Sequence, residues 1–319
     1  MKYRITLFLC LLFPCLATFS QEDDDLITLR IMTYNIRHGA GMDDVIDLDR
    51  QAAVIRDATP DLVGLQEVDS CVKRSSYVPQ AAVLGEKTGL YATFGGAIPL
   101  TGGKYGVAIL GKEQPLSVRN IPLPGKEKRT LLVCEFQEFV FATTHLDLDD
   151  SCRLASVPII IEEAARWEKP FFICGDWNDQ PSSTLITKLK KSFFFLNNLT
   201  NNTSNYTFPA GTPNRIIDYI ASYGIGTNRV VKSFGKRQVI NEPVASDHRP
   251  VLVEIKLNRY TTDIRSTDNG QRTTANECYN LAGQRIDSSL FAPHSSSLRS
   301  GGVLNKGVYI LNGKKVFIK

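Results

Sequence analysis

Short apolar runs recur along the chain from Leu29 onward, and turn residues separate them. Each run has strand length and is rich in β-branched and aromatic residues, which favour a strand over a helix. The pattern therefore predicts a protein with many strands. The predicted strands are Leu29–Tyr34, Leu62–Gln66, Gly106–Leu110, Leu131–Phe136, Phe139–Thr144, Phe171–Cys174, Ile216–Ile220 and Val251–Leu257.

Helical patterns lie between some of these strands. The predicted helices are Leu48–Ala58, Gln80–Thr88, Cys152–Trp167 and Ser182–Lys191. Many strands with interspersed helices and a long strand-rich middle indicate an α+β sandwich rather than a regular βαβ repeat.

The pattern changes after Leu257. Residues 258–276 are rich in Thr, Asp, Asn and Arg without apolar periodicity, so we predict a linker. Residues 277–319 alternate apolar and polar positions again, and Asn312–Gly313 is a strong signal for a hairpin turn. This tail is expected to form a small all-β module.

The first twenty residues predict a signal peptide. Lys2 and Arg4 precede an apolar run from Ile5 to Leu16, and small residues follow it. The run is too short for a comfortable membrane span, and no later stretch is long and apolar enough for one. We therefore expect a protein without a transmembrane segment that is exported to the periplasm, the cell surface or the medium.

Charge and cysteine content narrow the class further. The whole chain has a net charge of +4, and removing residues 1–20 takes away two basic residues and no acidic one, which leaves +2. This balance gives no overall basic field for nucleic acid.

The five remaining cysteines lack CxxC spacing. Cys134 and Cys174 are expected to be buried, and a bridge between Cys71 and Cys152 is left open. We expect a monomer.

The candidate chemistry lies at the ends of the predicted strands. Three of the four histidines, His38, His145 and His248, follow strand-like runs beside acidic or amide residues. Histidine titrates near neutral pH and is a frequent acid, base or phosphate contact. A lone histidine is more often structural, so the neighbouring residues decide its interpretation.

The string Gly175-Asp-Trp-Asn178 follows a buried strand. In extended geometry Asp176 and Asn178 would project to the same side. A carboxylate that accepts a proton and an amide that donates to an oxyanion suit the activation of water opposite phosphorus. A plain Asx turn is the competing structural interpretation.

Further acidic groups end other strands. Glu67 closes the run Leu62–Gln66, and a hard cation such as magnesium favours few carboxylates with open positions for phosphate oxygens. Asp247 and His248 are adjacent and can face different partners, while Asp218 can orient the imidazole and raise its pKa.

The order of these strings resembles the endonuclease/exonuclease/phosphatase superfamily over about residues 29–257. The strings are Met32-Thr-Tyr-Asn-Ile36, Leu65-Gln-Glu-Val68, Tyr105-Gly-Val-Ala-Ile-Leu110, Thr144-His-Leu-Asp147, Gly175-Asp-Trp-Asn178, Ile217-Asp-Tyr219 and Ser246-Asp-His248. The resemblance implies a DNase I-like four-layer α/β/β/α sandwich. It also implies hydrolysis of a phosphoester that depends on Mg²⁺ or Mn²⁺.

The resemblance implies a role for each matched residue. Asn35, Glu67 and Asp247 would hold the metal. Asp176 would act as general base on water, with Asn178 as its positioning partner. His248, held by Asp218, would face the phosphate and the leaving group, and His145 and Tyr105 would be further phosphate contacts.

Departures from the pattern leave the substrate open. Asp179 stands where inositol 5-phosphatases carry Arg, and Leu146 and Asp147 stand where sphingomyelinase-like members usually have Gln. The remaining substrates are a small molecule, a lipid headgroup or a nucleic acid. The alternatives are a secreted nuclease and a non-catalytic binding protein with the same fold.

The tail weakly resembles C-terminal modules of secreted Bacteroidetes proteins, some of which are sorting signals, although a stabilising hairpin would look similar.

Overall fold

The structure of the protein is a computed structural model that describes residues 26–226 and 229–260, together with the backbone of four short C-terminal strands. The predicted signal peptide lies outside the described residues, as does all of the predicted linker after Tyr260. The chain divides into two units, one ending at Tyr260 and one beginning at Thr261.

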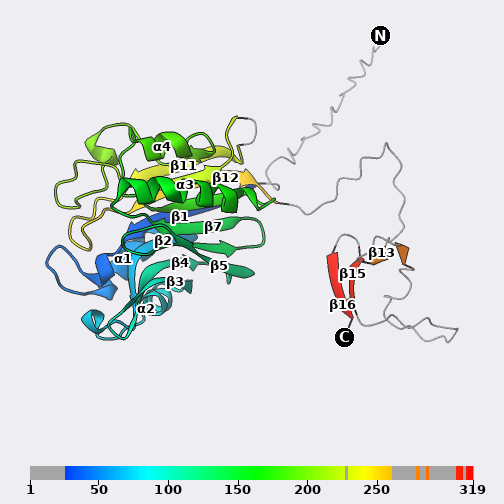
Figure 1. Cartoon of the computed structure of the whole chain (residues 1–319), viewed down its shortest axis with the longest axis horizontal. Coiled ribbons are helices and arrows are strands. Elements are labelled where there is room, and N and C mark those ends of the chain that lie inside the picture. Colours follow the sequence, from blue (N-terminus) through cyan, green and yellow to red (C-terminus); the bar gives the residue numbers. More distant parts are fainter. Residues whose placement is uncertain are drawn as a thin grey trace, which may run out of the picture. The chain divides into compact units, whose positions relative to one another are not determined.

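Two six-stranded sheets form the first unit (Figure 1). The first sheet has the order β11-β12-β1-β2-β4-β3, and the second has the order β5-β6-β7-β8-β10-β9. The strands of the first sheet are β11 (Val231–Val239), β12 (Val251–Asn258), β1 (Leu26–Asn35), β2 (Leu62–Ser70), β4 (Gly103–Gly111) and β3 (Tyr91–Leu100). Those of the second are β5 (Ser117–Leu123), β6 (Arg129–Glu135), β7 (Val140–His145), β8 (Phe171–Asp176), β10 (Asp218–Tyr223) and β9 (Phe193–Phe195).

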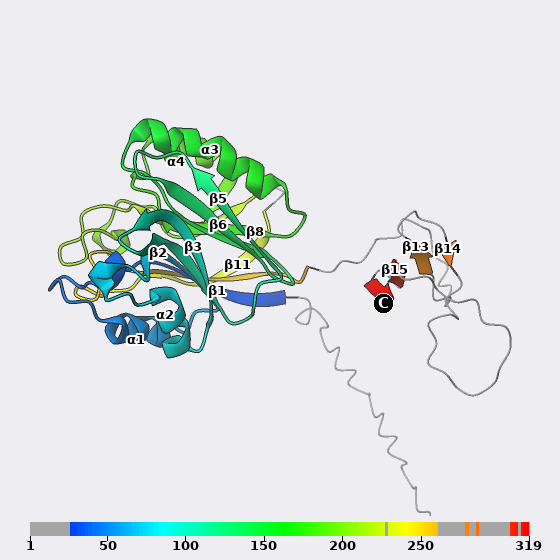
Figure 2. The same ribbon diagram turned by 60° about the horizontal axis from the view of Figure 1, so that its bottom comes forward.

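Three apolar clusters hold the layers together. Residues from both sheets, such as Ile31, Ile109, Phe141 and Phe172, form the central cluster. The helices α1 (Leu48–Ala58) and α2 (Gln80–Thr88) cover the first sheet, and α3 (Asp150–Ala165) and α4 (Thr184–Leu189) cover the second. Figure 2 shows the two pairs of helices on opposite sides of the sheets. The predicted four-layer α/β/β/α sandwich is confirmed.

Side-chain caps explain where the helices begin. Asp47 accepts a hydrogen bond from the backbone N–H of Arg50 at the start of α1, and Ser183 accepts one from Ile186 at the start of α4. Asp149 accepts from the N–H groups of Ser151 and Cys152 and starts α3 two residues before the predicted position. Short turns of 3₁₀ helix lie at Arg37–Gly39, Lys73–Ser75 and Thr203–Asn205.

All eight predicted strands are present, but four further strands were not predicted from the sequence. These are β3, β5, β9 and β11, and each lies at an edge of its sheet. An edge strand has one side without a neighbour and therefore needs fewer apolar residues. In β11 the residues from Lys232 to Gln238 are exposed or partly buried, which hides the strand from a search for apolar runs.

The second unit contains a four-stranded sheet of order β14-β13-β15-β16. Its strands are β13 (Cys278–Asn280), β14 (Arg285–Ile286), β15 (Gly307–Leu311) and β16 (Lys314–Ile318). β15 and β16 pair antiparallel with Leu311 opposite Lys314, which agrees with the hairpin predicted at Asn312–Gly313. The two turn residues themselves lie outside the described residues.

The four cysteines among residues 26–260 are free thiols. Cys134 and Cys174 are buried as expected, and burial raises the pKa of each thiol to about 12. Cys71 and Cys152 are also unpaired, so the bridge left open by the sequence is not formed. Within the described residues, no helix has the length and apolar character needed to cross a membrane.

Candidate functional site

The two sheets deliver the predicted site residues to one cavity of about 570 Å³, here called the polar cavity. Seven of the nine line it, namely Glu67, Tyr105, His145, Asp176, Asn178, Asp247 and His248. The other two support these from behind, because Asn35 donates to Glu67 and Asp176, and Asp218 contacts His248. His38, the third histidine singled out in the sequence, does not line the cavity.

Asp176 is the last residue of β8 and lies at the centre of the contacts. Its Oδ2 is 3.1 Å from the Nδ2 of Asn35 and 3.5 Å from the Nε2 of both His145 and His248. The residue before it must be glycine, because Gly175 has φ of 152° and a Cβ there would overlap the backbone carbonyl of Thr144. Burial raises the pKa of Asp176 to about 7, and Asp218 adds to this while the charge of His248 opposes it.

Asn178 reaches the cavity by a different route from the one expected. The chain does not continue extended, because Asn178 has φ of 51° and its N–H donates to Oδ1 of Asp176 over 2.9 Å. The segment is thus an Asx turn, and the expected extended geometry is wrong. Both side chains nevertheless line the polar cavity, so the Asx turn is compatible with a role in the site.

His248 and Asp218 form a buried pair. The Nδ1 of His248 is 3.0 Å from Oδ2 of Asp218, which is the first residue of β10. Burial by itself lowers the pKa of His248, but the carboxylates of Asp218 and Asp176 outweigh it and raise the pKa to about 10. The imidazole is therefore cationic at neutral pH, and its Nε2 lies 3.5 Å from Oδ2 of Asp176. The contact between Asp218 and the ring is the one expected from the sequence.

A β-bulge directs Glu67 into the polar cavity. The pairing of β2 with β4 shifts register between Leu65 and Val68, and Glu67 has φ of 57°. Its neighbours Gln66 and Val68 are both buried. The Nε2 of Gln66 donates to Oγ1 of Thr143 over 2.8 Å and so joins the two sheets. In the string Gln66-Glu67, the first residue has a structural role and only the second faces the cavity.

Asn35 links two carboxylates at the end of β1. Its Nδ2 donates to Oε1 of Glu67 and to Oδ2 of Asp176, each over 3.1 Å. Its Oδ1 accepts from the N–H of Arg37 over 3.0 Å and keeps a second lone pair. Ser246 donates to the carbonyl of Asn35 over 2.7 Å, which places the loop that carries Asp247 beside this group.

His145 is buried between two hydrogen-bond donors. The Nη1 of Arg129 lies 3.1 Å from its Nδ1, and the Nδ2 of Asn178 lies 3.0 Å from its Nε2. Burial lowers the pKa of His145 well below its usual value, and the charges of Arg129 and His248 lower it further. The ring is therefore neutral at pH 7 and can accept from only one of the two donors at a time.

The sequence did not reveal several residues that line the polar cavity. Arg129 is 7% exposed and lies in a charged run that gives no sign of burial. Phe208 packs its ring 4.7 Å from that of His248, and the guanidinium of Arg215 lies 4.7 Å above Phe208. Only the tertiary structure reveals this stack, because Phe208 and Arg215 come from a loop without periodic pattern.

The donor set around Glu67 fits a hard divalent cation. Glu67, Asn35 and Asp247 all offer oxygen, which magnesium and manganese prefer. Burial raises the pKa of Glu67, and its one hydrogen-bond partner among the described residues is the neutral amide of Asn35. A bound cation would compensate this partly buried carboxylate. The ligand atoms of Asp176, Asp218 and His248 lie within 4.8 Å of one another, a spacing that could hold a metal ion, but the nitrogen of His248 nearest Asp218 is already engaged with it.

The fold and the cavity together define a DNase I-like α+β sandwich with its polar residues gathered at one end of the strands. The chain belongs to the Endonuclease/Exonuclease/phosphatase family, whose sequence profile matches residues 32–248. It is therefore related to hydrolases of the phosphoesterase and nuclease type. No curated protein sequence matches the chain.

Solved structures with the same fold are distant in sequence. An endonuclease/exonuclease/phosphatase from Beutenbergia cavernae is 19% identical, with a TM-score of 0.59 over 82% of this chain and 88% of that one. The mannosyl-6-phosphatase Bt3783 of Bacteroides thetaiotaomicron is 19% identical, with a TM-score of 0.55 over 71% and 99%. A humanised D. rerio TDP2 is 17% identical, with a TM-score of 0.55 over 72% and 98%.

Proposed function

We propose that the protein hydrolyses a phosphoester by in-line attack of a water activated by Asp176, with Mg²⁺ or Mn²⁺ held by Glu67, Asn35 and Asp247. The placement of Asp176 carries this proposal. Its carboxylate lies in the polar cavity within 3.5 Å of both histidines and within 3.1 Å of an amide that also contacts Glu67. A base, a cation site and groups for a phosphate thus converge on one point.

The side chains divide the reaction among them. Asp176 accepts the proton of the attacking water as the new P–O bond forms. Asn178 and neutral His145 offer donors for the water and the phosphoryl oxygens. The imidazolium of His248, oriented by Asp218, faces the phosphate and can give its Nε2 proton to the leaving oxygen as the old P–O bond breaks. Tyr105 borders the same cavity as a further donor.

A divalent cation bound by Glu67, Asn35 and Asp247 would supply positive charge opposite the negative charge that develops on the phosphoryl oxygens. Contacts within the protein already hold two of these three side chains in place without the cation. Asn35 fixes Glu67 through one amide hydrogen, and Ser246 lies 3.3 Å from Oδ1 of Asp247.

The substrate proposed is a small phosphomonoester or phosphodiester rather than duplex nucleic acid. Glu67, Glu127, Asp176, Asp179 and Asp247 line the polar cavity, whereas the cationic side chains on its lining are those of Arg129 and Arg215 besides the histidines. Duplex binding depends on many phosphate contacts from Lys and Arg. Steeply salt-dependent DNA cleavage, faster than that of any small ester, would instead identify a nuclease.

Export completes the proposal. Residues 1–20 would be removed, and the mature chain would act outside the cytoplasm, as in secreted Bacteroidetes proteins with C-terminal β modules. N-terminal sequencing of the protein isolated from its native host would test the cleavage near Ser20–Gln21.

A hydrolysis assay tests the function directly. The purified mature protein is mixed with p-nitrophenyl phosphate, bis(p-nitrophenyl) phosphate and a panel of sugar, lipid-headgroup and nucleotide phosphoesters, with Mg²⁺, Mn²⁺ or EDTA. We expect turnover with metal and none with EDTA. Binding of the cation without hydrolysis of any ester would favour the rival hypothesis, a binding protein that keeps the fold.

A further inference from the structure

A second hollow of about 540 Å³ lies at the opposite end of the strands, here called the distal pocket. Phe171 lines it at the start of β8, whereas Asp176 at the end of β8 lines the polar cavity. Six residues of strand separate these positions by about 17 Å. Likewise, β10 runs from Asp218 to Tyr223 of the distal pocket. The distal pocket therefore cannot contact the reacting atoms.

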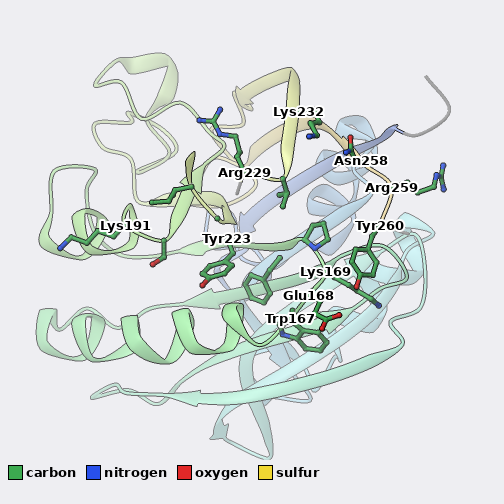
Figure 3. A pocket seen from close by; sticks show the side chains of 16 residues that line it. Trp167, Glu168, Lys169, Lys191, Tyr223, Arg229, Lys232, Asn258, Arg259 and Tyr260 are labelled. Atoms are coloured by element: carbon green, nitrogen blue, oxygen red, sulfur yellow. The ribbon is translucent and has the colours of Figure 1, made fainter. Parts of the chain in front are cut away.

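Positive charge dominates the distal pocket. Five cationic side chains line it, Lys169, Lys191, Arg229, Lys232 and Arg259, against the single carboxylate of Glu168. Figure 3 shows Lys191 and Arg259 at opposite ends of the hollow and Arg229 and Lys232 along one side. The cations thus surround the hollow rather than extend as a stripe over the surface.

Three of these cations have no carboxylate partner among the residues that the structure describes. Lys169 donates to Glu135, and Arg259 donates to Glu138. By contrast, no ion pair with another described residue involves Lys191, Arg229 or Lys232. Arg229 is nevertheless held in place, because its guanidinium lies 3.7 Å above the ring of Phe194.

Aromatic rings and polar groups share the same lining. Trp167, Tyr223 and Tyr260 are each partly buried. The indole Nε1 of Trp167 donates to Glu163 over 3.2 Å, and the ring of Tyr223 packs 5.5 Å from that of Phe193, so both rings are fixed. Ser192 and Asn258 add a hydroxyl and an amide.

We propose that the distal pocket binds an anionic sugar, a saccharide that carries sulfate, phosphate or carboxylate groups. Fixed aromatic faces suit the apolar face of a sugar ring, and hydroxyl and amide groups suit its hydroxyls. The three unpaired cations suit two or more negative groups through charge-assisted hydrogen bonds. The volume is that of a small-molecule site.

Single-stranded nucleic acid fits these features less well. Such a ligand needs a cationic groove that follows the backbone over several nucleotides. Here Lys191, Arg229 and Lys232 line one compact hollow, and the mature chain has a net charge of only +2. The distal pocket would therefore hold a discrete ligand or a residue of a longer glycan. This inference does not depend on the proposed hydrolysis.

The chain itself offers a second source of negative groups. Residues 22–25 read Glu-Asp-Asp-Asp and directly precede Leu26, which pairs with Asn258 of the distal pocket. Comparing the chain that begins at Gln21 with one that begins at Leu26 separates the two sources. Tighter sugar binding by the shorter chain would show that its own acidic residues compete for the site, and equal binding would assign the site to a free ligand.

Calorimetry with sucrose octasulfate tests the site, since this compact anionic disaccharide contains no phosphoester. We expect saturable binding by the mature chain that weakens with added salt. The double variant Lys191→Glu/Lys232→Glu should bind about 10-fold more weakly or worse, because it reverses two of the three unpaired charges. Turnover in the polar cavity should not change.

The matched control is Lys188→Glu/Lys236→Glu, which alters exposed lysines of α4 and β11 outside the distal pocket by the same net charge. It should bind like the parent. If both variants bound the sugar equally weakly, the binding would depend only on the net charge of the chain, and the proposal would be overturned. Absence of binding by the parent chain, or tighter binding of an oligo-dT strand than of the sugar, would also overturn it.

Discussion

The two ends of the sandwich carry opposite arrangements of charge on the same strands. At the end with the polar cavity, Asp176, Asp218 and His248 are buried, and His248 contacts both carboxylates. At the distal end, Lys191 and Lys232 are exposed and have no ion pair with a described residue. β8 has one end in each hollow, and β10 runs from Asp218, behind the polar cavity, to Tyr223 in the distal pocket. The same sandwich thus has a site of buried acidic groups held by their neighbours at one end and a site of exposed cations at the other.

The two ends differ in the free energy that it costs to keep their charges without a partner. Charges buried together must be held by neighbours, since an unpaired buried charge is costly. Exposed cations cost little to keep and remain free to pair with a ligand. Substitutions at the polar cavity should therefore impair chemistry or folding, whereas those at the distal end should alter only binding.

Asp176→Asn should cause the largest loss. The amide cannot accept a proton from water, so we expect turnover to fall by about 10³-fold or more. The fold should persist, because an amide can keep the contact with Asn35 through its oxygen. Hydrolysis of bis(p-nitrophenyl) phosphate measures the loss, and thermal unfolding provides the control. A variant that keeps near-full activity would remove Asp176 from the role of base.

Glu67→Gln should weaken the apparent affinity for magnesium by about 10-fold or more while extra metal recovers part of the rate. The carboxylate is lost, but the amide still fits the bulge. Rate measured against Mg²⁺ concentration, with calorimetry of metal binding, distinguishes the outcomes. If saturating metal recovers nothing and binding is unchanged, Glu67 is not a ligand.

In the His145→Gln variant, the free energy of unfolding should decrease less as the pH falls than it does in the parent protein. The pKa of His145 is lowered in the folded state, whereas the unfolded state titrates near its usual value of about 6.5. Below that pH the unfolded chain binds the extra proton, so this residue lowers stability as pH falls, by at most about 1.4 kcal/mol per pH unit. Denaturant unfolding at pH 7 and pH 5 compares the two proteins, and an unchanged slope would contradict a neutral buried imidazole.

Removing the second unit should have the smallest effect. A chain of residues 21–260 contains every strand of both large sheets and both hollows. Its turnover and melting temperature should match those of the mature chain. Insoluble protein, or soluble protein with much lower activity, would show that the tail contributes to the first unit.

The sequence predicted the central strands of the two sheets better than the strands at their edges. Buried strands such as β1 and β8 are continuous apolar runs, and they end in the residues that meet in the polar cavity. Edge strands such as β5 and β11 alternate with polar residues, so they gave no comparable signal. The nine candidate site residues could be predicted because strand ends and motif order mark them.

Other parts of the site depend on contacts that no local pattern encodes. Arg129 approaches His145 only because β6 and β7 pair, and Phe208 reaches His248 from a loop. The left-handed conformation of Asn178 also went unpredicted, because an Asx turn and an extended strand end share the same residues. Each of these features needed the tertiary structure.

The bulge at Glu67 has a consequence for how this kind of site can arise or disappear. In a regular strand, neighbouring side chains point to opposite faces, and Gln66 and Val68 are already committed to the interior. The single extra residue lets a carboxylate leave that alternation without disturbing the apolar packing on either side. Deleting one codon here would close the opening and restore an uninterrupted ladder. A sandwich that directs this carboxylate into the polar cavity and one that does not therefore differ by one residue in chain length.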